Sequence, residues 1–270
     1  MPDVTLFDGT VLPAIGLGTW AMGGEHQPDY SQDSRALAAI EAALAMGYSH
    51  IDTAEMYANG HTEELVGQAI KRFSRDQLFI TTKVRPPNLS YEKTLRAVDG
   101  SLRRLGVEII DLFLIHWRDS TPLAETFRAL NEAVRAGKIR YLGVSNFSVA
   151  EMAESQALSE TPIVTNQVPY SVTTRRYAEN GVLAYCQANN IVLTAYSPVE
   201  VGRLPVKDAL AEVAAAHEAT PYQIALAWLV QQPLVITIPM SHNPDHLRHN
   251  LDAATIQLTP AEMERLNGLG

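Results

Sequence analysis

Residues 77–117 read QLFITTKVRPPNLSYEKTLRAVDGSLRRLGVEIIDLFLIHW, and this segment indicates an α/β fold. Two apolar runs, FITTKV and IDLFLIHW, flank a helical pattern over Ser90–Leu105. Short continuous runs of this kind are typical of strands covered on both faces, as in a parallel sheet with crossover helices. The first run carries Lys83 near its end and the second carries His116, so both side chains are predicted at the same edge of such a sheet.

The same alternation extends along the chain. Strands are predicted over residues 14–20, 49–52, 77–84, 110–117, 139–145, 162–168, 190–197 and 234–239. Helices are predicted over Ser34–Met46, Thr62–Lys71, Ser90–Leu105, Thr121–Ala136, Ser148–Leu158, Arg175–Asn189, Asp208–His217, Tyr222–Gln231 and Asn243–Leu251. Eight strands with helices between them, and no linker or repeat, predict a single α/β domain over residues 1–270, a (β/α)8 TIM barrel.

The N-terminal segment VTLFDGTVLP is predicted to form a β-hairpin, because glycine in Asp8-Gly9 accepts the positive φ of a tight turn. A doubly wound sheet is the alternative architecture for such an alternation. It is disfavoured because GLG, Gly16 to Gly18, is not followed by the glycine spacing of a G-x-G-x-x-G dinucleotide-binding loop.

Composition indicates a soluble globular protein, with 46% hydrophobic and 19% charged residues. The net charge of -9 disfavours general binding to nucleic acid or to anionic membranes. The single cysteine, Cys186, has no partner for an intrachain disulfide, which fits a reducing cytosol. No signal-peptide pattern and no apolar run of membrane-spanning length is present. We therefore expect a cytoplasmic protein that binds neither nucleic acid nor membrane.

Four polar side chains are predicted to meet at the C-terminal mouth of the barrel, where barrels of this class keep their chemistry. Asp52 and Lys83 lie at the ends of successive strands, His116 follows the next strand, and Tyr57 comes five residues after Asp52. Tyr57 is the predicted general acid, and a lysine ammonium beside it is expected to lower its pKa by stabilising the phenolate. Asp52 is expected to hold Lys83, and His116 to orient a substrate oxygen. This group could protonate a carbonyl as a hydride arrives.

A second group of polar residues ends the later strands. Ser145 and Asn146 follow the fifth strand, Gln167 ends the sixth, and Tyr196 and Ser197 end the seventh. Their side chains could hydrogen-bond a flat ring bearing an amide and stack on it. After the eighth strand, polar residues precede and begin a helix whose free N–H groups attract phosphate, and two cations in an earlier loop could cover a pyrophosphate. These residues are Ser241, His242, Asn243, His246, Arg248 and His249, with Arg203 and Lys207 in the loop.

Taken together, GLGTW, HIDTAEMYANG, FITTKV, DLFLIHW, GVSNF, NQVPYS, AYSP and the final IPMS resemble the aldo-keto reductase family, as a short bacterial-type member. The resemblance runs from about Val4 to the C-terminus. It implies an eight-stranded α/β barrel closed at its base by an N-terminal hairpin. It also implies NAD(P)H-dependent reduction of aldehydes or ketones, such as methylglyoxal or aromatic aldehydes, without a metal and by a monomer.

The resemblance assigns roles to matching positions. The catalytic group would be Asp52, Tyr57, Lys83 and His116, with Trp20 and Trp117 at the substrate. Cofactor contacts are expected from Gly18, Thr19, Trp20, Asp52, Ser145, Asn146, Gln167, Tyr196, Ser197, Pro198, Val199, Arg203, Ile238, Met240, Ser241, His242, Asn243, His246, His249 and Asn250. Tyr196 would stack on the nicotinamide, and Ser241, Asn243 and Asn250 would contact the adenosine end.

Two positions depart from the family pattern. Met240 and His246 stand where many members carry the Lys and Arg that bind the 2′-phosphate of NADPH. NADP(H) is the favoured cofactor and NAD(H) the alternative. The chain ends at Gly270, where larger members have a further loop over the substrate, so we expect an open site that accepts varied small aldehydes.

Two other functional classes fit parts of the sequence. His50 and Asp52, with His116, form an incomplete ligand set for a metal-dependent barrel hydrolase. A regulatory subunit that binds the nicotinamide cofactor with little turnover is the other. The intact set of four polar residues favours the reductase over both.

Overall fold

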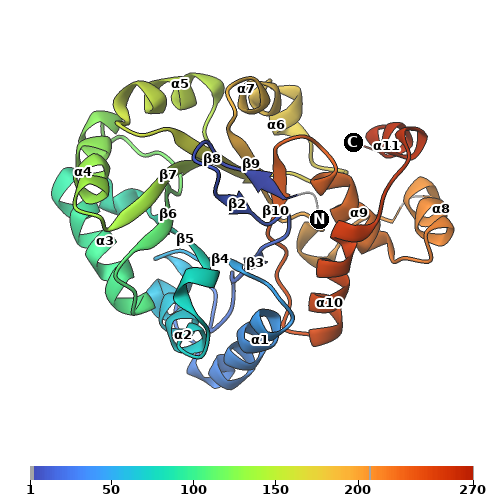
Figure 1. The fold of residues 1–270 in the computed structure, drawn as a ribbon, viewed down its shortest axis with the longest axis horizontal. Coiled ribbons are helices and arrows are strands. Elements are labelled where there is room, and N and C mark those ends of the chain that lie inside the picture. Colours follow the sequence, from blue (N-terminus) through green and yellow to red (C-terminus); the bar gives the residue numbers. More distant parts are fainter. Residues whose placement is uncertain (1–2, 207, 270) are drawn as a thin grey trace.

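The computed structural model describes residues 3–206 and 208–269, and over these residues it forms a barrel of eight parallel strands (Figure 1). The strands follow one another around the sheet in chain order. They are β3 (Leu17–Gly18), β4 (His50–Asp52), β5 (Phe79–Val84), β6 (Ile110–Ile115), β7 (Ile139–Ser145), β8 (Ile163–Pro169), β9 (Val192–Tyr196) and β10 (Val235–Thr237). A parallel bridge between Ile15 and Thr237 joins the first strand to the last, so the predicted (β/α)8 fold is confirmed.

Helices surround the strands (Figure 1). They are α1 (Asp33–Ala45), α2 (His61–Ile70), α3 (Tyr91–Leu105), α4 (Leu123–Arg135), α5 (Val149–Leu158), α6 (Arg176–Glu179), α7 (Val182–Ala188), α8 (Asp208–Ala216), α9 (Pro221–Val230), α10 (Pro244–Asp252) and α11 (Pro260–Asn267). Short 3-10 turns are η1 (Tyr30–Gln32), η2 (Tyr57–Gly60), η3 (Arg75–Gln77), η4 (Pro86–Asn88), η5 (Glu200–Gly202) and η6 (Ala253–Thr255). Within the described ranges, no helix has both the length and the apolar character needed to cross a membrane.

Two local predictions differ from the structure. The helix predicted over Arg175–Asn189 is split into α6 and α7, because Gly181 adopts a left-handed φ of +86° between them. The helix predicted over Thr121–Ala136 begins later, at Leu123, with Pro122 as its N-cap. Thr259 and Glu262 form a reciprocal capping box at the start of α11.

The N-terminal hairpin closes the base of the barrel. Strands β1 (Val4–Thr5) and β2 (Val11–Leu12) pair in antiparallel fashion around a turn in which Gly9 has a φ of +89°. Leu6 and Leu12 of this hairpin belong to one buried apolar cluster with side chains of the barrel strands, including Phe79 and Leu112. This plug leaves the opposite, C-terminal end of the barrel open for a binding site.

His61 links the first turns of two helices outside the barrel. Its Nε2 lies 2.8 Å from Asp33 Oδ1 in α1, and its Nδ1 lies 3.0 Å from Glu64 Oε2 in α2. Burial opposes the charged imidazole, but the two carboxylates outweigh it and raise the pKa of His61. The link is therefore strongest when His61 is protonated.

This shift predicts a small dependence of stability on pH. Because the pKa of His61 is higher in the folded state, its contribution is complete at a pH below the ordinary value of about 6.5 and is lost as pH rises through the folded pKa. We expect the midpoint of thermal unfolding to fall between pH 6 and pH 9 by a few degrees more in the wild-type protein than in His61→Gln. Equal slopes in the two proteins would contradict the assignment.

Candidate active site

Three side chains form a buried chain of polar contacts at the mouth of the barrel. Lys83 Nζ donates to Asp52 Oδ1 at 2.5 Å, to the Thr53 carbonyl oxygen at 2.8 Å and to Tyr57 Oη at 3.3 Å. Lys83 is completely buried and Asp52 is 1% exposed. The predicted contacts of Asp52 and Tyr57 with Lys83 are therefore present in the structure.

The backbone explains how Tyr57 reaches this position. Asp52 ends β4, and the chain then turns through η2 before α2 begins. Ala58 and Asn59 adopt left-handed φ values of +46° and +54°, and Gly60 follows at +94°. This tight turn at the barrel rim returns the Tyr57 ring over Lys83, whose Nζ lies 5.0 Å from the ring centroid.

The electrostatics keep the phenol protonated. Burial raises the pKa of Tyr57 above its ordinary value, and the Lys83 ammonium opposes this rise without cancelling it. Lys83 lowers the pKa of Tyr57 as predicted, but desolvation of the phenolate is the larger effect, so the net shift is upward. Burial alone would lower the pKa of Lys83, but the contributions of Asp52 and Tyr57 are together larger and raise it. The net pKa is therefore above the ordinary value, and the amine stays charged.

His116 lies beside Tyr57, directly after β6. The two ring centroids are 5.9 Å apart, and the Trp117 ring packs edge-on against His116 at 4.4 Å. Burial, with the Lys83 charge, lowers the pKa of His116 well below its ordinary value, so the imidazole is neutral. Its Nδ1 is buried and has no hydrogen-bond partner among the described residues. Trp20 also packs edge-on against Tyr57, with ring centroids 5.0 Å apart.

The second predicted group is joined by hydrogen bonds. Gln167 Nε2 donates to Asp52 Oδ2 at 2.7 Å, which links it to the first group. Ser145 Oγ donates to the Gln167 carbonyl oxygen at 2.8 Å. Asn146 Nδ2 donates to the His116 carbonyl oxygen at 3.1 Å, and Tyr196 Oη donates to Asn146 Oδ1 at 3.0 Å. Burial raises the pKa of Tyr196 to about 12, so this phenol is also neutral.

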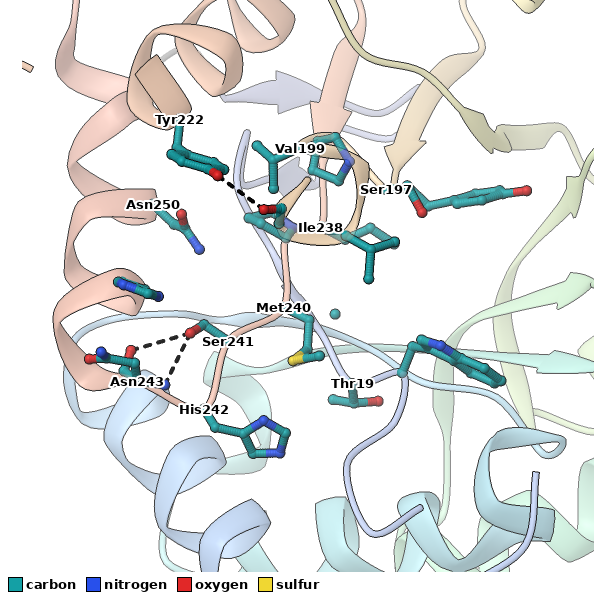
Figure 2. Close-up of a pocket in the computed structure, with 18 of the residues that line it drawn as sticks. Thr19, Ser197, Val199, Tyr222, Ile238, Met240, Ser241, His242, Asn243 and Asn250 are labelled. Carbon is teal, nitrogen blue, oxygen red and sulfur yellow. Dashed lines mark hydrogen bonds between the residues drawn. The ribbon is translucent and has the colours of Figure 1, made fainter. Parts of the chain in front are cut away.

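A cavity of about 970 Å³ extends from Tyr57 to the start of α10. Figure 2 shows part of its wall, with Thr19 and Ser197 toward one end and Asn243 and Asn250 toward the other. The predicted residues that line it are Gly18, Thr19, Trp20, Asp52, Tyr57, Gln167, Tyr196, Ser197, Pro198, Val199, Ile238, Met240, Ser241, His242, Asn243, His246, His249 and Asn250. An elongated cavity of this volume suits a dinucleotide rather than a small substrate alone.

Several predicted residues are not on this wall. Lys83, His116, Trp117, Ser145 and Asn146 are not among its lining residues. Arg203 is exposed and does not line the cavity, so the structure does not bring its side chain to the predicted pyrophosphate position. Lys207 lies outside the described residues.

The sequence profile of the aldo/keto reductase family matches residues 14–270 of this chain. The chain belongs to the aldo/keto reductase family. Among curated relatives, methylglyoxal reductase YeaE of Escherichia coli (strain K12) is 38% identical, over 97% of this chain and 92% of that protein. Glyoxal reductase of Bacillus subtilis (strain 168) is 34% identical, over 98% of this chain and 92% of that protein.

Solved structures agree with the fold of this aldo/keto reductase. The thermostable aldo-keto reductase Tm1743, in complex with the inhibitor epalrestat, is 45% identical with a TM-score of 0.96, and the match covers 100% of both chains. An aldo/keto reductase from Klebsiella pneumoniae, in complex with NADP and acetate, is 37% identical with a TM-score of 0.89, over 99% of this chain and 95% of that chain.

The geometry of this aldo/keto reductase gives no support to a metal site. Both carboxylate oxygens of Asp52 accept hydrogen bonds, from Lys83 and Gln167. His50 Nε2 instead lies 2.9 Å from Thr81 Oγ1, and burial lowers the pKa of His50 to about 3. In residues 3–206 and 208–269, no group of three His, Cys, Asp or Glu side chains is arranged to hold a metal ion.

Sequence reasoning missed part of the cavity wall of the aldo/keto reductase. The missed residues are Val201, Gly202, Thr220, Tyr222, Gln223, Pro239 and Asp245. Tyr222 Oη donates to the Gly202 carbonyl oxygen at 3.0 Å across one side of the cavity (Figure 2). For Val201 and Gly202 the available signal was their place in the loop after β9, because loops that follow barrel strands lie at the mouth.

Proposed function

We propose that this aldo/keto reductase reduces small aldehydes and ketoaldehydes to alcohols with NADP(H). The observation that carries the proposal is the buried Asp52–Lys83–Tyr57 chain of contacts at one end of the 970 Å³ cavity. The names of relatives support the substrate class, since they include a methylglyoxal reductase and a glyoxal reductase. The NADP in the Klebsiella pneumoniae structure supports the cofactor.

The residues along the cavity fit a dinucleotide. The buried His242 Nε2 has no hydrogen-bond partner among the described residues. This ring nitrogen can therefore form a hydrogen bond with a ligand at the end of the cavity near α10. In our proposal Gln167 on the cavity wall holds the nicotinamide amide together with Ser145 and Asn146, which are linked to it by hydrogen bonds, and Tyr196 packs on the ring. Ser241, Asn243 and Asn250 hold the adenosine end, while Gly18, Thr19 and Trp20 border the reacting end.

When bound, the cofactor supplies a hydride to the carbonyl carbon. Tyr57 gives its phenolic proton to the carbonyl oxygen, which requires the neutral phenol that burial favours. The Lys83 ammonium, 3.3 Å away, stabilises the phenolate that remains, and Asp52 holds that ammonium in place. Neutral His116 donates a hydrogen bond to the carbonyl oxygen and orients it. Trp20 and Trp117 provide apolar walls for the substrate.

The direct test is loss of the reduced-nicotinamide absorbance, with NADPH and NADH run in parallel against methylglyoxal and a panel of aromatic and aliphatic aldehydes. Aldehyde-dependent loss of absorbance supports the reductase. A folded sample that binds nucleotide but turns over no aldehyde with either cofactor would instead favour a regulatory role.

Substitution of His246 is expected to change the preference between NADPH and NADH. Asp245 and His246 line the cavity at the start of α10. The carboxylate of Asp245 repels the 2′-phosphate of NADPH. Arginine adds a permanent charge and two parallel donors that histidine lacks. We expect His246→Arg to lower the KM for NADPH by roughly tenfold, the effect of one hydrogen bond to a charged group. NADH lacks the 2′-phosphate and serves as the control; an equal gain with NADH would contradict this role.

A further inference from the structure

A second cavity, of about 220 Å³, lies outside the barrel mouth, and half of the residues that line it are cations. We call it the basic cavity. Five of the 21 lysines and arginines of the chain line it, with Glu55 as the opposing charge: Arg85, Lys93, Arg96, Arg103 and Arg104. This concentration of positive charge occurs in a protein whose net charge is -9.

The neighbouring carboxylates neutralise only part of this charge. Arg104 is paired with the buried Glu63, its Nη2 lying 2.6 Å from Glu63 Oε2. Arg96 lies 3.7 Å from Glu92, and both side chains are largely exposed. None of the described residues forms a salt bridge or a side-chain hydrogen bond with Arg103. The basic cavity therefore keeps an excess of positive charge that water and salt must screen.

Glu55 offsets only one of the remaining positive charges. Its Oε1 already accepts hydrogen bonds from the Arg85 backbone N–H at 2.7 Å and from Asn88 Nδ2 at 3.0 Å. Arg85 Nε is 3.9 Å from the same oxygen, beyond hydrogen-bond distance, and this buried donor has no partner among the described residues. The Arg85 side chain lines the basic cavity without a hydrogen bond to the described residues, so its guanidinium group can donate to an acceptor from outside the chain.

The shape of the basic cavity depends on small residues. Gly100 of α3 lines it, and a Cβ on Gly100 would lie 3.0 Å from Arg104 Nη1. The side-chain amides of Asn59 and Asn88 also line the basic cavity. Guanidinium groups and amides from separate elements therefore converge on one small volume, as the tetrahedral oxygens of a phosphoryl group require.

We propose that the basic cavity binds a small oxyanion of the phosphate class. Arg85, Arg96 and Arg103 would donate to it, and Lys93 would add charge. The source is either inorganic phosphate or the phosphoryl group of a small phosphate monoester. This site is separate from the 970 Å³ cavity, and the two share no lining residue.

The bound anion would also contact the turn that carries Tyr57. Glu55 and Asn59, which line the basic cavity, stand two residues before and two residues after Tyr57. Arg104 packs on the same turn, since a Cβ on Gly60 would lie 2.8 Å from Arg104 Nε. Occupation of the basic cavity is therefore expected to slow hydrogen exchange at residues 53–60.

The test is calorimetric titration of the full chain with inorganic phosphate and, separately, with glycerol 3-phosphate, at constant ionic strength set by sodium chloride. Three proteins are compared: the wild type, Arg96→Glu/Arg103→Glu, and the control Lys71→Glu/Arg72→Glu. Each double variant changes the net charge equally, and all four side chains are exposed, so folding is preserved. Lys71 and Arg72 do not line either cavity.

We expect saturable binding to the wild type and the control, and at least tenfold weaker binding to Arg96→Glu/Arg103→Glu. Whichever anion binds more tightly identifies the source. No saturable binding to the wild type would overturn the proposal. So would equal binding to all three proteins, which would indicate an ion held elsewhere, or binding that leaves exchange at residues 53–60 unchanged. None of these readouts depends on the carbonyl substrate.

Discussion

Replacing Tyr57 with phenylalanine is expected to reduce turnover of every carbonyl substrate by about 10²–10⁴-fold, the usual contribution of a positioned general acid. The substitution removes the phenolic proton and the contact of 3.3 Å with Lys83 Nζ. It keeps the ring that packs against Trp20 and His116. The measurement is kcat with methylglyoxal or the best aldehyde of the panel, together with circular dichroism and the thermal midpoint.

A matched control separates loss of the acid from a general effect of removing a hydroxyl group. Tyr185→Phe removes a phenol that donates to Gln156 at 2.8 Å, away from the mouth of the barrel. Its turnover should stay near the wild-type value. A folded Tyr57→Phe enzyme with nearly normal kcat would take the role of proton donor away from Tyr57.

Replacing Lys83 with methionine is expected to abolish most activity and to destabilise the fold by about 3–5 kcal/mol, because it leaves the partner charge of a buried ion pair uncompensated. Asp52 is 1% exposed and would keep only Gln167 as a side-chain partner. The measurement is the free energy of unfolding from urea titration, with kcat determined on the same sample.

A double variant distinguishes the two effects. In Asp52→Asn/Lys83→Met the buried charge is gone, while an amide oxygen at position 52 still accepts from Gln167. Most of the lost stability should return, yet turnover should stay low, because no ammonium stabilises the Tyr57 phenolate. Recovery of activity along with stability would show that Lys83 serves the fold alone.

The convergence of Asp52, Lys83 and His116 was predictable because their positions follow from strand geometry. Parallel strands carry their C-terminal ends to the same edge, so the positions of Asp52, Lys83 and His116 at the ends of successive apolar runs bring them together. The fold was predictable for the same reason, since the strand order follows the chain order.

Other features depend on the three-dimensional surroundings of each residue. The hydrogen bond from Gln167 to Asp52 joins residues 115 positions apart, and no local pattern indicates it. Tyr222 reaches the cavity from the start of α9 rather than from a strand end. The pKa of Tyr57 rises because the ring is buried, and the degree of burial depends on packing across the whole mouth.

The seam between the first and last strands has a mechanical consequence. The Ile15–Thr237 bridge and a few backbone bonds, such as Gly18 N–H to the Pro239 carbonyl at 3.2 Å, hold this junction. Gly18 and Ile238, on either side of it, both face the 970 Å³ cavity. A molecule bound in this cavity would contact both the first and the last strand of the sheet. Its binding therefore stabilises the closed barrel against separation of the first strand from the last.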